Sequence, residues 1–185
     1  MVAYSKGMPV GTSAPAFSLP GVDMDGRSYS LDAFQEAKLL VVIFTCNHCP
    51  YAQALEQRFI DLQRDYAAKG VRLVAINSND ARTYPDDSFE HMRERAREQG
   101  WNFPYLHDET QDVARAYDAA CTPDIFVFDA ERKLRYNGRC DDNWREADKV
   151  TRQDLRRALD LLLRGQAVDF DVHPALGCSI KWKAA

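Results

Sequence analysis

The chain has 185 residues, a formal net charge of −4 and 45% hydrophobic residues, which together suit one soluble domain with a real core. The acidic balance argues against nucleic-acid binding, which usually needs a basic face, and no run of about 18 apolar residues predicts a membrane span. The first eight residues also lack the apolar stretch of a signal peptide, so we expect a cytoplasmic protein.

The first predicted strand is residues 39–44, a continuous apolar run typical of a strand buried on both faces of a parallel sheet. Apolar residues then recur at three- and four-residue spacing from Ala52 to Tyr66, which predicts a helix that Gly70 ends. Residues 71–76 read as the next strand. This strand–helix–strand order favours a right-handed parallel crossover.

Short helices and strands are predicted for the second half of the chain. The helices are expected at 85–99 and 108–119. A short edge strand is expected at 103–106, because Pro104 has no N–H for a central ladder. Residues 125–128 and 134–137 then form a predicted hairpin.

The last predicted helix starts at Thr151, with Asp154 three residues on as in a capping box, and ends at Gly165. Residues 166–185 show little periodicity and predict no regular element. Because no repeat or linker divides the chain, we expect a single domain over residues 1–185, with its core at about 11–165 and a tail at 166–185.

Cys46 and Cys49 are the close pair among the five cysteines, and they stand between the predicted buried strand and the helix. Pro50 suits the first turn of that helix, and Asn47 is the expected N-cap. The amino end of a helix favours thiolate over thiol, and a protonated His48 adds to this effect. We expect Cys46 to be the more exposed, attacking thiol and Cys49 to resolve the mixed disulfide.

The expected stabilisation of the thiolate follows from the shift in the cysteine pKa. A free cysteine has a pKa of about 8.5, and a drop of about 1.5 units makes half of it thiolate at neutral pH. That drop corresponds to about 2 kcal/mol of preferential thiolate stabilisation.

A C-x-x-C pair also occurs in zinc sites, which need two further ligands, usually as a second C-x-x-C or H-x-x-H pair. The chain has no such second pair, and its other histidines are scattered. We therefore expect no metal and no cofactor. A zinc site and a pair of inert buried cysteines remain the alternatives.

Four segments resemble the thioredoxin-like branch of the peroxiredoxin-related (AhpC/TSA-like) proteins. They are Gly11–Pro20, Phe44–Tyr51, Cys121–Asp124 and Gly177–Lys183. The resemblance implies an α/β thioredoxin fold: a central mixed β-sheet flanked by helices, with an N-terminal β-hairpin extension and an insertion before the final hairpin. It also implies that Thr122 and Pro123 form a cis-proline loop beside the cysteine pair, whose backbone meets the extended chain of a substrate.

The chain departs from both relatives in ways that bear on chemistry. Peroxiredoxins place Thr or Ser three residues before the peroxide-reacting cysteine; if that were Cys49, Cys46 stands there instead. The peroxiredoxin arginine would align near Pro123. Thioredoxin has a buried acid six residues before its first cysteine, where this chain has Leu40. These changes favour disulfide exchange over peroxide reduction and leave His48 or water to handle the proton.

We therefore predict a thiol–disulfide oxidoreductase that acts on a protein or small-molecule disulfide and is restored by a reducing partner such as a thioredoxin system. With His48 between the cysteines, the expected potential lies between about −250 and −120 mV. The alternatives are a peroxiredoxin-like peroxidase and a non-enzymatic redox sensor or scaffold.

Two other cysteines bear on this prediction. Cys121 and Cys178 are possible additional redox thiols, although burial as spectators is the simpler interpretation for each. Cys178 could also link two chains in a homo-oligomer.

Overall fold

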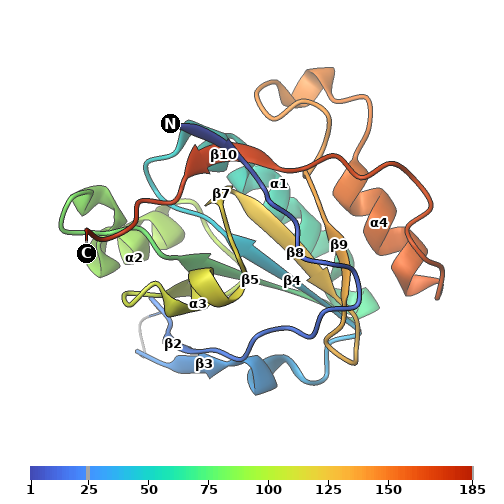
Figure 1. Cartoon of the computed structure of the whole chain (residues 1–185), viewed down its shortest axis with the longest axis horizontal. Helices are drawn as coiled ribbons and strands as arrows, with labels where there is room; N and C mark the ends of the chain where they lie inside the picture. The colour runs from blue at the N-terminus through green and yellow to red at the C-terminus, as the bar shows by residue number, and fades with distance from the viewer. Residues whose placement is uncertain (24–25, 185) are drawn as a thin grey trace.

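The computed structural model describes residues 1–23 and 26–184; residues 24–25 and 185, which the single-domain prediction includes, lie outside the described part. A five-stranded sheet in the order β6-β5-β4-β8-β9 forms its centre (Figure 1). The strands are β4 (Leu39–Phe44), β5 (Val71–Asn77), β6 (Tyr105–His107), β8 (Asp124–Phe128) and β9 (Leu134–Asn137). Strands β4, β5 and β6 run parallel, and β8 is antiparallel to both β4 and β9, so the sheet is mixed, as expected.

Helices cover both faces of this sheet. They are α1 (Pro50–Tyr66), α2 (Phe89–Glu98), α3 (Asp112–Ala116) and α4 (Asp154–Leu163). Alternate residues of β4 face opposite ways: Leu39, Val41 and Ile43 pack in one core cluster with α1, α2 and α4, and the residues between them pack in a second cluster with α3. All six β4 side chains are buried, which explains the continuous apolar run in the sequence.

The additions expected from the resemblance are also present. An N-terminal hairpin pairs β2 (Ser18–Pro20) with β3 (Ser28–Ser30), and a 3-10 turn, η1 (Leu31–Phe34), follows it. The insertion between β5 and the β8–β9 hairpin carries the 3-10 turn η3 (Pro85–Asp87), α2, β6 and α3. The α/β thioredoxin fold is therefore confirmed.

Helix boundaries differ from the predicted ones for local reasons. The helix predicted over 85–99 begins at Phe89, because the Ser88 side chain accepts the His91 N–H as its N-cap. The capping box predicted at Thr151 is wrong: Gln153 is the N-cap of α4 and makes no side-chain cap. The Thr151 hydroxyl instead donates to the carboxylate of Asp142. Two more 3-10 turns, η2 (Ala67–Lys69) and η4 (Ala147–Lys149), complete the chain path.

A second sheet, missed by the sequence analysis, joins the two ends of the chain. It has the order β1-β10-β7, with β1 (Val2–Tyr4), β10 (Leu176–Ser179) and β7 (Cys121–Thr122), and β1 and β10 lie together in Figure 1. The predicted tail thus contributes the central strand of this sheet. Among the described residues, no helix is long and apolar enough to cross a bilayer.

Candidate active site around Cys46 and Cys49

The cysteine pair lies where β4 leads into α1. Cys46 and Cys49 form a small buried cluster with Ala52, against which Tyr51 and Cys178 pack. Their relative exposures are 2% and 0%, so both thiols are buried and exposure does not set Cys46 apart as the attacking thiol. The expected N-cap is wrong as well: Cys49 itself occupies the N-cap position of α1, and Pro50 is the first helical residue.

All five cysteines carry free thiols. The Cys46 thiol hydrogen-bonds the Cys49 sulfur, and this contact is the main reason that the pKa of Cys49 falls to about 4, against the opposing effect of burial. The Cys178 thiol and the Ala52 N–H add to the lowering. The same Cys49 contact, together with burial, raises the pKa of Cys46. The charge of the reduced pair therefore lies on Cys49 and not, as expected, on Cys46.

Thr122 and Pro123 lie beside the pair. Their peptide bond is cis, the Thr122 hydroxyl is 3.2 Å from Cys46 Sγ, and the Thr122 carbonyl accepts the protonated Cys49 thiol at 3.1 Å. The backbone edge of Thr122, where the resemblance implies an extended substrate, is paired with Cys178 of the chain's own strand β10. Pro123 also lines a cavity of about 260 Å³ with Leu55 and other residues.

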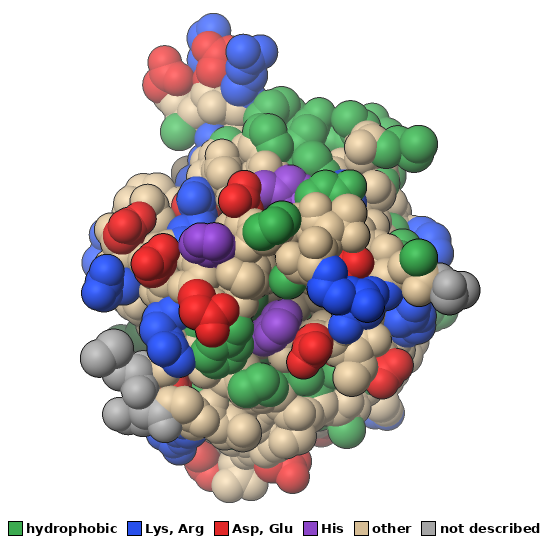
Figure 2. All heavy atoms as spheres, turned by 90° about the vertical axis from the view of Figure 1, so that its left-hand side faces the viewer, with side chains coloured by type: hydrophobic (Ala, Val, Ile, Leu, Met, Phe, Trp, Pro, Cys, Tyr) green, Lys and Arg blue, Asp and Glu red, His purple; other side chains and the backbone are tan. Residues whose placement is uncertain are grey.

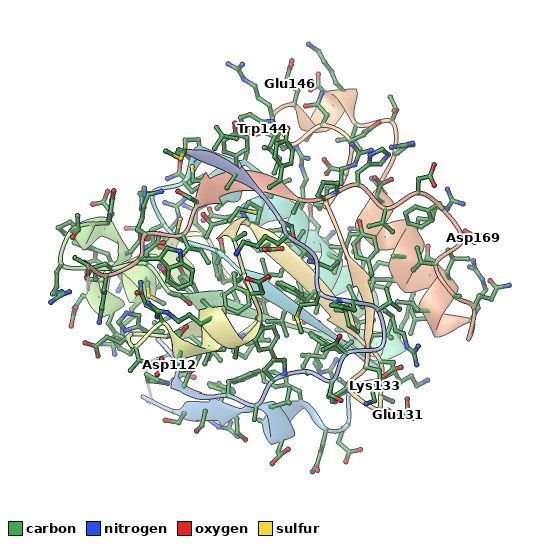
Figure 3. All side chains as sticks on the ribbon, in the orientation of Figure 1. Asp112, Glu131, Lys133, Trp144, Glu146 and Asp169 are labelled. Carbon is green, nitrogen blue, oxygen red and sulfur yellow. The ribbon has the colours of Figure 1, made fainter. Side chains whose placement is uncertain are left out.

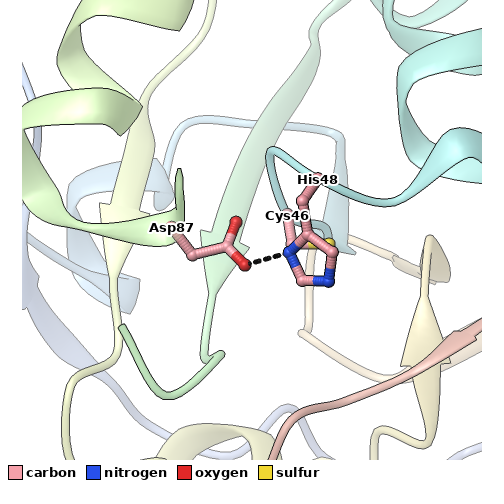
Figure 4. A group of neighbouring side chains, drawn as sticks. All are labelled: Cys46, His48 and Asp87. Atoms are coloured by element: carbon pink, nitrogen blue, oxygen red, sulfur yellow. Dashed lines mark hydrogen bonds and ion pairs between the residues drawn. The ribbon is translucent and has the colours of Figure 1, made fainter. Parts of the chain in front are cut away.

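His48 is held by a carboxylate that the sequence analysis did not find. Its Nδ1 lies 2.5 Å from Asp87 Oδ2 (Figure 4). This hydrogen bond is the main cause of a raised His48 pKa, which partial burial opposes. Asp87 lies in η3, 38 positions beyond Cys49 in the sequence. No motif or spacing connects the two segments, so only the fold brings them together.

Asp87 is itself fully buried and saturated with donors. Besides His48, it accepts the Asn47 N–H at 2.6 Å and the side-chain amides of Asn77 and Asn79 at 3.1 and 2.9 Å. Burial works to raise the pKa of this carboxyl, but the hydrogen bonds outweigh it and the pKa falls below its ordinary value. Asp87 is therefore an anion at neutral pH, and the partner that it favours is imidazolium.

Aromatic rings fix the neighbouring side chains. The His48 ring stacks on Tyr84 at 4.9 Å between centroids with 8° between planes, and Lys181 Nζ lies 5.7 Å from the centre of the Tyr84 ring. Trp144, on the segment between β9 and α4 (Figure 3), contacts the Tyr51 ring in the first turn of α1, with 4.0 Å between centroids.

Cys46, His48 and Asp87 offer donor atoms that all lie within 4.8 Å of one another, and they form the one such group in the described part of the chain. Their donor set of sulfur, nitrogen and oxygen could suit a transition metal. However, the Asp87 oxygens already accept amide N–H groups and the facing His48 nitrogen. The arrangement therefore serves a hydrogen-bonded ion pair better than a metal.

The two additional candidate thiols fall into different environments. Cys121 is fully buried, with its thiol directed to the carbonyls of Pro123 and Ala175, and burial raises its pKa. Cys178 is partly exposed and lies against Cys49, which with burial raises the Cys178 pKa to about 11. The structure brings Cys178 to the pair and directs Cys121 away from it.

The face that carries α2 and the C-terminus shows basic and acidic side chains interspersed, with no broad patch of one sign (Figure 2).

Comparisons with known proteins agree with this architecture. The model of the Redoxin family matches residues 9–158. A conserved protein of uncharacterised function from Geobacillus kaustophilus is 46% identical, with a TM-score of 0.94 over 100% of this chain and 98% of that one. A hypothetical protein from Sinorhizobium meliloti 1021 is 40% identical, with a TM-score of 0.93 over 98% and 99%.

More distant structures share the fold alone. The thioredoxin domain of a thiol-disulfide oxidoreductase from Bacteroides vulgatus is 20% identical, with a TM-score of 0.59 over 71% of this chain and 89% of that domain. A search of curated proteins finds no match.

Proposed function

The chain belongs to the Redoxin family, and from this membership and the site geometry we propose that it is a thiol–disulfide oxidoreductase that cycles between a Cys46–Cys49 dithiol and disulfide. One observation carries the proposal: the two thiols are in hydrogen-bond contact at the amino end of α1, and one of them has a strongly lowered pKa. Inert buried cysteines have no such partner and have raised pKa values, as Cys121 and Cys140 do.

The charge distribution supports roles opposite to those expected from the sequence. Cys49 is the thiolate of the reduced pair and attacks a disulfide sulfur, which releases the first thiol of that disulfide. Cys46 then attacks Cys49 Sγ, which closes the Cys46–Cys49 bond and releases the second thiol. The Cys46 proton passes to one of the two released thiolates and the other takes its proton from water, so one disulfide is exchanged for another. Cys46 can lose its proton at this stage because the Cys49 charge no longer opposes it.

The Asp87–His48 pair serves as the ionic group beside Cys46. The chain lacks the buried acid of thioredoxin, since Leu40 stands at that position. An imidazolium near the sulfurs stabilises the thiolate form and so the reduced state. We therefore place the reduction potential above that of thioredoxin, between about −250 and −120 mV.

The partners are proposed on chemical grounds. The substrate is a disulfide, and a dithiol reductant of the thioredoxin type restores the pair in a cytoplasmic setting. Because β10 already pairs with Thr122, an extended polypeptide has no free backbone edge at this point of the loop. This favours a small or locally exposed disulfide over a long extended segment.

Redox titration tests the proposal. The protein is equilibrated in glutathione buffers of defined potential, trapped with N-ethylmaleimide and analysed for the Cys46–Cys49 disulfide by peptide mass spectrometry. We expect a two-electron transition in the stated range, lost in Cys46→Ser and Cys49→Ser and retained in the control Cys140→Ser. Absence of that disulfide at any potential, or a failure to reduce insulin or a small aromatic disulfide, would refute the function.

A peroxidase is the second candidate, and one observation favours it: the low-pKa sulfur, Cys49, is followed directly by Pro50 at the helix start, and Cys46 donates to it from three residues upstream. Stopped-flow mixing of the reduced protein with hydrogen peroxide separates the two activities. Fast saturable consumption that Cys49→Ser abolishes would assign the peroxidase. A sensor or scaffold would form the disulfide and turn over neither substrate.

A further inference from the structure

Cys178 is a thiol beside the cysteine pair that the reaction proposed above does not use. It packs against the Cys46, Cys49 and Ala52 cluster, close enough that its thiol lowers the pKa of Cys49. Cys49 therefore has a sulfur neighbour on each of two sides, Cys46 and Cys178. A sulfur in that position can form a disulfide with either neighbour.

The position of Cys178 is built into the fold. It stands opposite Thr122 on one side and Val2 on the other, in the central strand of the second sheet. Gly177 lets β10 approach this closely, because a Cβ there would lie 2.1 Å from the Thr122 carbonyl oxygen. A hydrogen bond from Thr122 Oγ1 to the Cys178 carbonyl adds a further link.

The segment after β10 is anchored as well. The Lys181 N–H donates to Asn79 Oδ1 at 2.8 Å, the Lys181 carbonyl accepts the Asp80 N–H at 2.9 Å, and Gln111 bonds the Lys181 carbonyl and the Lys183 N–H. A segment so tied holds Cys178 in register with the cysteine pair.

Access distinguishes the three thiols. Thiol–disulfide exchange needs an approach to the sulfur that is attacked. Cys46 and Cys49 expose 2% and 0% of their surface, whereas Cys178 is partly exposed. An external thiol therefore meets Cys178 before it can meet either member of the buried pair.

We propose that Cys178 is a third redox thiol, which forms an alternative disulfide with Cys49 and carries oxidising equivalents between the buried pair and the surface. The inference rests on the proposed function, since the Cys46–Cys49 disulfide is its starting point. The Cys178 thiolate attacks Cys49 Sγ; the Cys46–Cys49 bond breaks, the Cys49–Cys178 bond forms, and Cys46 leaves as a thiolate that takes up the proton given by Cys178.

The next step is exchange with an external thiol. Its thiolate attacks Cys178 Sγ and releases Cys49 as the thiolate, so a mixed disulfide remains on Cys178. A second external thiol then attacks that mixed disulfide and restores the Cys178 thiol. Overall, two external thiols become one disulfide and the protein gains two electrons and one proton, because Cys49 stays a thiolate and the second proton goes to water. The low pKa of Cys49 makes it a good leaving group in the first of these attacks.

Disulfide mapping in Cys46→Ser tests the inference directly. This variant lacks the primary disulfide, so oxidised glutathione should drive Cys49 and Cys178 into an intramolecular bond. We expect a crosslinked peptide containing both residues after N-ethylmaleimide trapping and proteolysis without reductant. The peptide should be lost in Cys46→Ser/Cys178→Ser and kept in Cys46→Ser/Cys121→Ser, because the Cys121 thiol faces the other way.

A kinetic measurement completes the test. In the otherwise native chain, Cys178→Ser should slow reduction of the Cys46–Cys49 disulfide by dithiothreitol by about tenfold or more, because attack on a buried disulfide loses its relay. Cys121→Ser should leave that rate unchanged.

The outcomes separate the two proposals. If the Cys46–Cys49 disulfide forms but no Cys49–Cys178 peptide appears and the reduction rate of Cys178→Ser matches the native one, the relay is wrong and the oxidoreductase stands. If native protein forms no Cys46–Cys49 disulfide, the proposed function fails first. Thermal unfolding of Cys178→Ser checks that the variant keeps its fold.

Discussion

The buried Asp87 carboxylate offers the sharpest test of the site. In Asp87→Asn the side-chain shape is kept, but the charge is lost and one carboxylate oxygen becomes an NH₂ group. That group would face hydrogen-bond donors, since both oxygens now accept from the backbone N–H of Asn47, the ring of His48 and the amides of Asn77 and Asn79. At least one of these donors must lose its acceptor.

The expected magnitudes follow from those contacts. Leaving a buried donor without an acceptor costs about 1–3 kcal/mol, and removing one partner of a buried ion pair costs more. Because the His48 side chain is 22% exposed, water compensates in part, and we expect a loss of about 2–4 kcal/mol in unfolding free energy. The His48 pKa, raised mainly by this hydrogen bond, should fall to its ordinary value or below.

The pKa shifts of His48 and Asp87 also fix the direction in which folding stability changes with pH. The raised His48 pKa gives stability that is complete below its ordinary value of 6.5 and is lost as the pH rises through the folded-state value. The lowered Asp87 pKa gives stability that is present above 3.8 and is lost as the pH falls through the folded-state value. The native protein should therefore exceed Asp87→Asn in stability most between these two limits.

The assay is an NMR titration of the His48 ring protons combined with urea unfolding at several pH values. Asp108→Asn is the matched control, because Asp108 is also fully buried but accepts from Ser78 and the backbone of α3. That control should lose stability without moving the His48 pKa. An unchanged His48 pKa in Asp87→Asn would refute the reasoning.

Three further predictions concern the pair and its supports. Thiolate absorbance at 240 nm should rise in a step near pH 4 that Cys49→Ser abolishes and Cys121→Ser keeps; a first step near pH 8–9 would show an ordinary thiol. Gly177→Ala should cost about 1–3 kcal/mol in urea unfolding, because the new Cβ meets the Thr122 carbonyl, and wild-type stability would contradict the close approach of β10. Tyr105→Phe should cost about 1–3 kcal/mol, because Asn47 Oδ1 loses the Tyr105 hydroxyl, and an unchanged midpoint would show that the contact adds nothing.

The sequence predicts the central sheet well, because its strands carry strong local signals. Residues 39–44 are apolar on both faces, and in the structure the same residues are buried on both faces. The hairpin of β8 and β9 and the helix that ends near Gly70 are recovered for the same reason: turn residues and periodicity act over a few positions.

The parts that the sequence does not predict depend on long-range contacts. β10 has only four residues and owes its conformation to β1 and β7, from the far end of the chain and from the cis-proline loop. In the sequence, Asp87 is one acid in a charged stretch. Only the packing of η3 against the cysteine loop brings it to Asn47 and His48, while Asn77 and Asn79 reach it from the end of β5. β10 and Asp87 thus each depend on a partner that lies dozens of residues away in the sequence.

The start of α1 adds to the difference in pKa between the two sulfurs. Had the helix begun between the cysteines, its free N–H groups would have favoured a thiolate at Cys46. Pro50 instead follows the second cysteine and takes the first helical position, so the Ala52 N–H lies near Cys49. Cys46, three residues upstream, becomes a donor to that thiolate. The position of the helix start thus adds to the lowering of the Cys49 pKa that the Cys46 thiol mainly causes.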